Sequence, residues 1–476
     1  MPLIAGVDSS TQSTKVEIRD QETGAVIASA SAPHPAVMAP VSEQNPASWW
    51  IAFEQAWAQV GSPRVAAISV GGQQHGMVAL DSEGTAVHPA KLWNDTESAD
   101  DANRLTGLVS PADWAAAVGS VPVAAFTITK LAWLARTHTD VWQRVRHVML
   151  PHDYITNRLS GHLTTGSTTD RGDASGTGYW SPADGTYRTD LLDLVDNTRD
   201  WDSMLPRVLG PMDDAGRSTS ATIATGAVVA PGTGDNMAGA LGVGLRPGDA
   251  VISIGTSGTV YAVSNTPTSD PSGAVAGFAD ATGRFLPLVC TSNAAKVVDA
   301  VARLLGADHD EFDRLALAAL PDGPTLLPYF DGERTPNRPD ARGVIGGLRT
   351  DVTREQFARA AVDGVACGLL DGLDALRALT ALNGRVMLTG GGARSQAMQQ
   401  VVASLIDSPV VLSSADEAVA TGAAVQACAV LEQVDHSVIQ DRWGLGAGAN
   451  VDPIIAPDTT TRSRYAALRD ASQSHG

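Results

Sequence analysis

A hairpin pattern that occurs twice constrains the fold of this chain more than any other feature. The apolar strand Leu3–Val7 leads through a turn rich in Ser and Thr to a second strand, Thr14–Arg19. Much later, the strands Val251–Ile254 and Thr259–Val263 flank the turn Gly255–Gly258. Turn residues between two short β-branched runs are typical of β-hairpins, and recurrence of such a unit indicates a repeat. The chain is therefore predicted to contain a duplicated domain.

The segments outside the hairpins predict an α/β fold class. Val65–Val70 has the apolar, β-branched composition of a buried strand. Val386–Thr389 is similar and ends in three glycines, after which a helix is expected from Ser395, a strand at Val410–Leu412 and an Ala-rich helix at Glu417–Leu431. Strands that alternate with helices form layered α/β domains.

Length and glycine content indicate where two domains meet. A chain of 476 residues is long enough for about two or three domains. Residues 228–244 are very rich in Gly and Ala, and the second hairpin begins shortly afterwards. We therefore expect an N-terminal domain over residues 1–244 and a C-terminal domain over residues 245–476.

The charge balance argues against nucleic acid and membranes as partners. The net charge is −19, and no run of Lys and Arg would attract a phosphate backbone or an anionic lipid surface. The long uncharged stretches contain too much Gly, Ser and Thr to span a bilayer. A nucleotide would have to be bound locally, by backbone N–H groups, a few arginines and a divalent cation.

Cysteine usage and the first residues predict a cytoplasmic protein. The three cysteines are widely spaced and form no C-x-x-C motif, so neither a disulfide framework nor a zinc site is indicated. The N-terminus has no basic leader, and Asp8 interrupts its apolar stretch too early for a signal peptide.

Asp8 closes the first strand and is followed by the hydroxyls of Ser9, Ser10 and Thr11. A carboxylate at such a turn is able to hold hydrated Mg²⁺, while the hydroxyl and backbone N–H groups of the turn meet phosphate oxygens. The alternative is that Asp8 only hydrogen-bonds its own turn. No G-x-x-x-x-G-K-[ST] motif occurs, so a P-loop is excluded.

Asp235 is a candidate general base. It lies between Gly232 and Gly239, among residues too small to shield it, and the amide of Asn236 follows it directly. A carboxylate in this setting is able to accept a proton from a hydroxyl while the amide orients that hydroxyl. The alternative is an N-cap for the Ala- and Gly-rich stretch that follows, and the two roles are compatible.

Two glycine turns and two polar runs are further candidates. The turn Gly255–Gly258 is suited to grip phosphates, and Gly390–Ala393 at the end of a strand is suited to lie against a planar group such as adenosine, although both also serve as plain tight turns. Gln73–Gly76 and Asn94-Asp95 offer donors and acceptors for a polyol near strand ends. A lone histidine is usually structural, so His75 is a candidate only because of the polar residues beside it.

In their order and spacing these segments resemble the FGGY carbohydrate kinases over nearly the whole chain. The segments that carry the resemblance are Ser42–Pro46 with Trp49-Trp50, Gly72–Gly76, Leu92–Asp95, Leu150–Tyr154, Gly234–Asn236, Ile252–Gly258, Leu327–Tyr329, Gly332–Pro336 and Gly390–Ser395. The resemblance implies an actin-like ATPase fold, with two ribonuclease-H-like α/β domains and a cleft between them. It also makes a homodimer reasonable.

The activity implied by the resemblance is ATP-dependent phosphorylation of D-xylulose to D-xylulose 5-phosphate. Asp235 would be the base, and Asp8 would organise Mg²⁺ and ATP. The implied sugar contacts are Gln74, His75, Asp95 and Asn236, and the implied nucleotide contacts are Thr11, Thr256, Gly391, Gly392 and Ala393. The alternatives are a kinase for ribulose, gluconate, glycerol or a similar compound, and a non-catalytic sugar-responsive actin-like protein.

The chain departs from the family pattern at three positions. The usual D-x-G-T opening reads Asp8-Ser9-Ser10-Thr11, the methionine often found before the sugar-site histidine is Gln74, and the arginine common after Trp-Asn-Asp is Glu97. These differences bear on the identity of the sugar more than on phosphoryl transfer.

Overall fold

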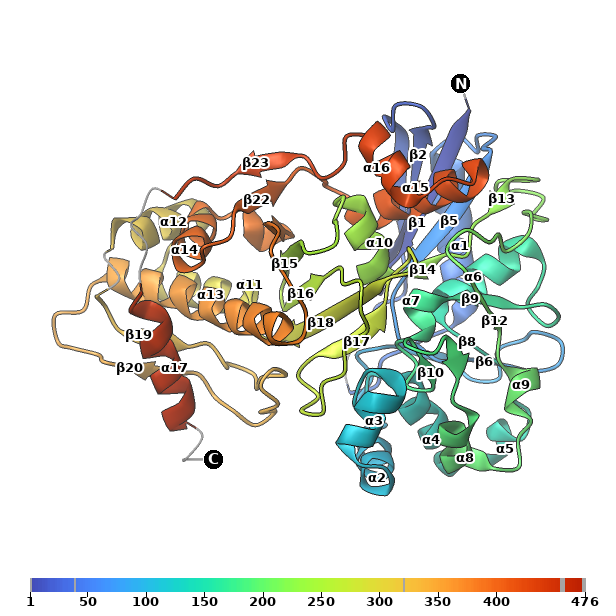
Figure 1. The fold of residues 1–476 in the computed structure, drawn as a ribbon, viewed down its shortest axis with the longest axis horizontal. Helices are drawn as coiled ribbons and strands as arrows, with labels where there is room; N and C mark the ends of the chain where they lie inside the picture. The colour runs from blue at the N-terminus through green and yellow to red at the C-terminus, as the bar shows by residue number, and fades with distance from the viewer. Residues whose placement is uncertain (1, 38–39, 320–321, 454–458, 473–476) are drawn as a thin grey trace. The chain divides into compact units, whose positions relative to one another are not determined.

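A computed structural model describes residues 2–37, 40–319, 322–453 and 459–472 of the chain (Figure 1). The chain forms two compact units. Unit 1 comprises Met1–Gly244, Asn265–Leu286 and Ala415–Gly446, and unit 2 comprises Leu245–Ser264, Pro287–Ser414 and Ala447–Gly476. The expected boundary between residues 244 and 245 stays a prediction. Among the described residues, no helix combines the length and the apolar character needed to cross a lipid bilayer.

The sheet of unit 1 has the strand order β13-β5-β1-β2-β3, and β14 also pairs with β5. The strands are β1 (Leu3–Ser9), β2 (Ser13–Asp20), β3 (Val26–Pro33), β5 (Ala67–Gly72), β13 (Val228–Val229) and β14 (Thr233–Gly234). β1 is antiparallel to β2 and parallel to β5. Every residue of β5 is buried. The first hairpin and the buried strand predicted at Val65–Val70 are confirmed.

The helices of unit 1 pack around this sheet and extend away from it (Figure 1). They include α1 (Pro46–Gln59), α2 (Ala99–Leu108), α3 (Pro111–Val118), α4 (Thr127–Thr137), α6 (Pro151–Ser160), α7 (Arg171–Ala174), α8 (Thr189–Asp196), α10 (Asp235–Gly242), α15 (Ala418–Glu432) and α16 (His436–Arg442). Asn45 caps α1, because its side-chain oxygen accepts the N–H of Ala47 at 3.0 Å. The buried face of α1 carries Trp49, Phe53 and Trp57, which anchor the helix in the core.

α15 lies unusually close to α10 because small residues face each other across the contact. A Cβ at Gly422 of α15 would overlap the Ala238 carbonyl of α10, and a Cβ at Gly242 would overlap the Ala418 carbonyl. α15 also packs on β1 and β5. The helix that begins at Asp235 is thereby fixed, through α15, to the strand that carries Asp8.

The sheet of unit 2 repeats the strand pattern of unit 1. Its strands include, in this order, β18 (Phe285–Thr291), β16 (Gly258–Ala262), β15 (Ala250–Ile254), β21 (Val386–Thr389), β22 (Val410–Ser413) and β23 (Gly448–Asn450). β18, β16 and β15 form an antiparallel meander, and β21 and β22 continue in parallel with β15. In unit 1 the meander β3, β2 and β1 is likewise followed by the parallel strand β5. The predicted duplication is confirmed at the level of strand order.

Local capping signals in the sequence mark the starts of several helices of unit 2. The helices of this unit include α11 (Ala295–Leu305), α12 (His309–Ala318), α13 (Arg354–Leu379), α14 (Gln396–Leu405) and α17 (Thr461–Ala471). Thr353 and Gln356 form the predicted capping box at the start of α13, and Ser395 caps α14. The cap of α14 at Ser395 directly follows the turn after β21, where the three glycines lie.

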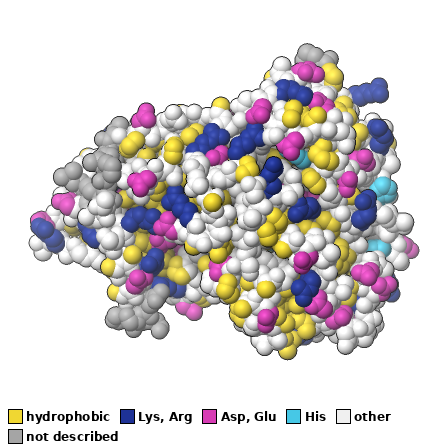
Figure 2. Space-filling model, viewed as in Figure 1, with side chains coloured by type: hydrophobic (Ala, Val, Ile, Leu, Met, Phe, Trp, Pro, Cys, Tyr) yellow, Lys and Arg dark blue, Asp and Glu magenta, His cyan; other side chains and the backbone are white. Residues whose placement is uncertain are grey.

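The surface carries charges of both signs. On the face shown in Figure 2, Lys and Arg side chains are interspersed with Asp and Glu side chains. Exposed ion pairs such as Arg188–Asp190 and Arg349–Asp351, with N···O distances of 2.8 and 2.7 Å, illustrate this mixing. Each of these two pairs neutralises its own charges locally.

Candidate active site

Asp8 lies at the carboxyl end of β1, next to Gly71 of β5 in the sheet register. Its Oδ1 atom is buried and has no hydrogen-bond partner among the described residues. Burial raises the pKa of Asp8 to about 7, and the charge of Glu417 adds to this shift while Lys15 opposes it. Lys15, which faces Asp8 across the hairpin, forms an ion pair with Glu417. A buried carboxylate oxygen without a donor is suited to a cation.

Asp235 is the first residue of α10 and follows β14 directly. β14 is parallel to β5, with Thr233 opposite Gly71 and Gly234 opposite Gly72. Asp8 and Asp235 therefore approach the same edge of the sheet, from strands on either side of β5. Burial raises the pKa of Asp235 to about 7, and the charge of Asp8 adds to this shift. The structure brings the two predicted aspartates together.

The side chain of Asn236 orients Asp235. The Oδ1 atom of Asp235 accepts the backbone N–H of Asn236 at 2.8 Å and its side-chain Nδ2 at 2.9 Å. Gly234, rather than Asp235, occupies the N-cap position of α10. The carboxylate thus uses one oxygen in a local hydrogen-bonded turn at the start of the helix.

Gln74 is linked to the same group. Its Oε1 accepts a hydrogen bond of 2.8 Å from Asn236 Nδ2, which fixes the orientation of the amide. The Nε2 atom of Gln74 is buried and has no hydrogen-bond partner within the described part of the chain. Because an unpaired buried donor is costly, this amide is suited to meet a ligand oxygen.

His75 is held in a strained, aromatic setting. Its φ of 65° lies in the left-handed region, which non-glycine residues seldom adopt. Its Nδ1 lies 2.6 Å from the Gly176 carbonyl oxygen. Its ring stacks on the Phe126 ring with a centroid distance of 5.0 Å, and it lies tilted against the Phe278 ring with a centroid distance of 5.5 Å. The surrounding residues therefore fix both the position and the orientation of the imidazole.

The Thr11 hydroxyl joins Gln73, which belongs to the polar run proposed for a polyol, to Trp93, to which sequence reasoning assigned no role. It donates to Gln73 Oε1 at 3.1 Å and accepts from Trp93 Nε1 at 3.0 Å. The Nε2 atom of Gln73 is buried and finds no hydrogen-bond partner among the described residues. The signal for Gln73 was its place in the same polar run as Gln74. The predicted contact of Thr11 with the nucleotide stays a prediction.

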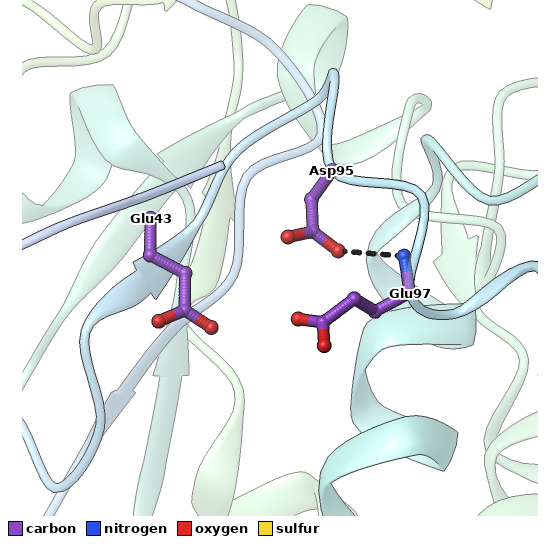
Figure 3. A group of neighbouring side chains, drawn as sticks. All are labelled: Glu43, Asp95 and Glu97. Atoms are coloured by element: carbon purple, nitrogen blue, oxygen red, sulfur yellow. Dashed lines mark hydrogen bonds between the residues drawn. The ribbon is translucent and has the colours of Figure 1, made fainter. Parts of the chain in front are cut away.

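Asp95 lies in a cluster of carboxylates around Lys91. Glu43, Asp95 and Glu97 converge in Figure 3, where the Glu97 N–H donates to Asp95 at 3.1 Å. The Lys91 ammonium lies 3.0, 2.9 and 2.6 Å from Glu43, Asp95 and Glu97. Burial alone would lower the pKa of Lys91, but these carboxylates raise it. The point on which these acidic groups converge with metal-like spacing is thus contacted by the ammonium of a lysine.

Two departures from the family pattern have structural reasons. Glu97, in place of an arginine, is bound by Lys91. Ser10, in place of a glycine, closes the first hairpin, because its hydroxyl donates to the Ser13 carbonyl at 3.1 Å.

Asp95 also accepts the Ser42 N–H at 2.9 Å and is 1% exposed. Its predicted contact with the sugar stays a prediction.

In unit 2, the predicted nucleotide residues lie near the ends of β15 and β21. Thr256 lies exposed in the turn after β15, and its carbonyl accepts the N–H of Ala294 at 3.3 Å. Gly390, with φ 87°, begins the turn after β21. A Cβ at Gly390 or Gly392 would collide with Ile254 of β15. The two strand ends therefore meet through these glycines.

Gly391 differs from its two glycine neighbours. A Cβ at this position would meet nothing within 4 Å. Packing thus explains Gly390 and Gly392 but leaves Gly391 facing open space, while Ala393 behind it is 1% exposed. An open glycine backbone beside a buried alanine provides a flat surface of the kind expected for a planar ligand.

Comparison with known proteins identifies the family. Residues 3–242 match the N-terminal domain, and residues 250–431 the C-terminal domain, of the FGGY family of carbohydrate kinases. The chain is 45% identical over 480 residues to a xylulose kinase of Streptomyces coelicolor, covering 99% of this chain and 97% of that protein. It is 45% identical over 478 residues to a xylulose kinase of Streptomyces rubiginosus, with coverages of 99% and 97%.

A solved structure agrees with this assignment. The crystal structure of xylulose kinase from Bifidobacterium adolescentis has a TM-score of 0.88 and 40% sequence identity, and covers 98% of this chain and 99% of that chain. The predicted α/β class and the actin-like ATPase fold, which FGGY sugar kinases share, are confirmed. The chain belongs to the FGGY family of carbohydrate kinases, phosphotransferases with an alcohol group as acceptor.

Proposed function

We propose that this protein transfers the γ-phosphoryl group of ATP to the 5-hydroxyl of D-xylulose and releases D-xylulose 5-phosphate and ADP. Its similarity to xylulose kinases over nearly the full length supports the choice of sugar. The paired carboxylates of Asp8 and Asp235 at one sheet edge support the chemistry. Phosphoryl transfer requires mainly alignment and charge neutralisation, and it requires no protein nucleophile.

Asp235 is proposed as the general base. In this step the 5-hydroxyl oxygen bonds to the γ-phosphorus, the bond from that phosphorus to the β,γ-bridging oxygen breaks, and the hydroxyl proton passes to Asp235. A base with a pKa near the working pH is both deprotonated and basic enough to accept a proton, and the pKa of about 7 meets this condition. The position of Asp235 beside Asp8, oriented by Asn236, is the observation on which this role rests.

Asp8 is proposed to hold the Mg²⁺ that accompanies ATP. The fit rests on its buried Oδ1 atom, which has no donor among the described residues, because Mg²⁺ prefers carboxylate oxygens and retains several waters. Bound Mg²⁺ would neutralise phosphate charge during transfer. Lys15 is directed to Glu417 and leaves the Asp8 carboxylate available.

The remaining site residues divide between sugar and nucleotide. The Gln74 and Asn236 amides, with His75 and Asp95, are proposed to bind the sugar hydroxyls. The proposed nucleotide contacts are Thr11, Thr256, Gly391, Gly392 and Ala393. The N-terminal domain, residues 1–244, would bind the sugar, and the C-terminal domain, residues 245–476, would bind ATP. The cytoplasmic location and the homodimer stay predictions.

A coupled assay of ADP release tests the proposal. The purified protein is assayed with Mg²⁺, ATP and, in turn, D-xylulose, ribulose, gluconate and glycerol. We expect D-xylulose to give the highest kcat/KM. A higher kcat/KM for another compound would show that this compound is the preferred phosphoryl acceptor, and the proposed phosphoryl transfer would stand. Binding of ATP and sugar without ADP release for any compound would support a non-catalytic protein instead.

A further inference from the structure

In unit 1, a cluster of buried charged and polar side chains includes Thr233 and so adjoins the segment that leads into Asp235. Its members are Thr233 of β14, Asp170 of β9 (Thr168–Asp170), His152 and Asp153 of α6, and Asp173 of α7. Thr233, His152, Asp153 and Asp173 are 0% exposed, and Asp170 is 3% exposed. Burial of so many ionisable groups is expensive unless they are paired. The mechanism above gives these residues no role.

The link from this cluster to the base is a short hydrogen bond. The Thr233 hydroxyl donates to Asp170 Oδ2 at 2.6 Å, and Thr233 lies two residues before Asp235. Both neighbours of Thr233 in the chain, Gly232 and Gly234, lack side chains. Among residues 232–234, Thr233 is therefore the one whose own side chain anchors the segment leading into α10, and Gln426 holds the Gly232 carbonyl at 2.9 Å from outside it.

Asp170 is in turn rigidly held. Its Oδ1 accepts the N–H of Asp173 at 2.9 Å, and its Oδ2 accepts the N–H of Gly172 at 2.8 Å, so that it caps α7. A Cβ at Gly172 would press on Thr233 Oγ1 and on Met237 of α10. α7 thus abuts both the strand before Asp235 and the helix after it.

His152 supplies the counter-charge for this group. Its Nδ1 lies 2.6 Å from Asp173 Oδ2, and its Nε2 lies 3.2 Å from Asp153 Oδ1 and 3.7 Å from Asp170 Oδ1. Burial alone would lower the pKa of His152, but the carboxylates outweigh burial and raise it to about 10. A protonated His152 stabilises the ionised form of Asp170, which is the stronger acceptor for the Thr233 hydroxyl.

We infer that Thr233 is a positioning residue: its hydrogen bond to Asp170 holds the start of α10 so that the Asp235 carboxylate meets the sugar hydroxyl. This inference rests on the proposed role of Asp235 as the base. A hydrogen bond that fixes a catalytic group acts on turnover more than on substrate binding, since a displacement of about 1 Å is able to cost up to about 100-fold in rate.

The test compares Thr233→Val, which removes the hydroxyl and keeps the branched shape, with Thr233→Ser, which keeps the hydroxyl. Thr168→Val, on the same strand as Asp170, is the matched control, because it removes a buried hydroxyl that is bonded to Asn157. We expect kcat to fall about tenfold or more in Thr233→Val, with both KM values within about twofold of wild type. Thr233→Ser and Thr168→Val should stay within about threefold of the wild-type kcat.

A double-mutant cycle separates positioning from general structural damage. In the Asp235→Asn background, Thr233→Val should lower the residual turnover no further, because the group that it positions is already lost. The inference is overturned by a kcat of Thr233→Val within threefold of wild type, by an equal loss in Thr233→Ser, by a loss confined to KM, or by additive losses in the cycle. If Thr233→Val does not fold, Asp170→Asn is measured by the same criteria.

The Asp235→Asn variant alone distinguishes the proposed base role of Asp235 from the proposed positioning role of Thr233. Near-normal turnover of this variant would remove the proposed base, whatever Thr233→Val shows. A steep loss in Asp235→Asn together with normal turnover in Thr233→Val would leave the base in place and remove only the positioning role.

Discussion

The first hairpins of the two units share their strand pairing but differ in their chemistry. In unit 1, Asp8 lies at the carboxyl end of β1, faces Lys15 across the hairpin and is influenced by the charge of Glu417. In unit 2, the turn after β15 holds Thr256 among Gly and Ser residues and contains no charged side chain. The same strand topology thus presents ionisable side chains at the end of the unit 1 hairpin. At the end of the unit 2 hairpin it presents backbone and hydroxyl groups. We infer that unit 1 provides the acid–base chemistry and that unit 2 provides the nucleotide contacts other than Thr11.

The largest effect expected from this contrast is the loss of turnover on substitution of Asp235. Asp235→Asn removes the proton acceptor and keeps the shape, so kcat should fall by about 10²–10⁴-fold, the usual contribution of a general base. The measurement is steady-state ADP release with D-xylulose, alongside circular dichroism to verify folding. Thr256→Ala in unit 2 is the comparison, and it should change the KM for ATP more than kcat. Equal losses of kcat in both variants would contradict the division of roles.

The second effect is a dependence of kcat/KM on pH. The pKa of Asp235 is raised to about 7, so its carboxylate is increasingly protonated below pH 7 and is then unable to accept a proton. We expect kcat/KM, measured at constant free Mg²⁺, to fall at least about tenfold per pH unit well below pH 7, since Asp8 becomes protonated over the same range. A profile that is flat between pH 5 and pH 7 would be inconsistent with Asp235 as the titrating base.

The third effect concerns the open glycine of unit 2. Gly391→Leu places a side chain where a Cβ meets no atom within 4 Å, so the protein should fold normally. If adenosine lies there, the KM for ATP should rise about tenfold, which corresponds to about 1.4 kcal/mol, and the KM for the sugar should stay constant. Gly392→Ala is the structural control, since its Cβ would collide with Ile254 and should lower the melting temperature. An unchanged KM for ATP in Gly391→Leu would place the nucleotide elsewhere.

The smallest effect expected is a gain in stability at the unit 1 edge. The pKa of Asp8 is raised in the folded state, so folding favours the protonated form of this carboxyl. Its contribution to the free energy of unfolding is therefore largest below about pH 4 and is lost as the pH rises through about 7. Asp8→Asn should therefore raise the free energy of unfolding at pH 8 by about 0.5–2 kcal/mol, at the expense of activity. Urea denaturation at pH 8 and pH 4 measures this gain, which should vanish at pH 4. A destabilised variant at pH 8 would show that the carboxylate is favourably paired.

Much of the fold follows from local signals in the sequence. Asn45-Pro46 predicts the start of α1, and Thr353 with Gln356 predicts the start of α13, because capping depends on residues adjacent in the chain. The alternating and apolar runs of the two hairpins predict their strands for the same reason. Nothing local indicates that α15 packs on β1, since that contact depends on small residues from distant segments.

The candidate site was predictable only in part. Asp8 lies at the carboxyl end of β1 and Asp235 follows β14, and β5 lies between these two strands. Because the ends of parallel strands share a sheet edge, the proximity of the two aspartates agrees with the pattern. The cluster joins His152 of α6 to Asp170 of β9 and Asp173 of α7, and no local pattern in either segment predicts this pairing. Its charge pairing emerges only when tertiary structure brings these segments together.

The most direct measurement is a crystal structure of the protein with D-xylulose and a non-hydrolysable ATP analogue. We expect the 5-hydroxyl oxygen of the sugar within about 2.6–3.2 Å of an Asp235 carboxylate oxygen, the range for proton transfer to a general base. The γ-phosphorus should lie on the other side of that hydroxyl. A sugar bound with no hydroxyl near Asp235, or an Asp235 carboxylate shut away from the sugar, would contradict the proposed mechanism.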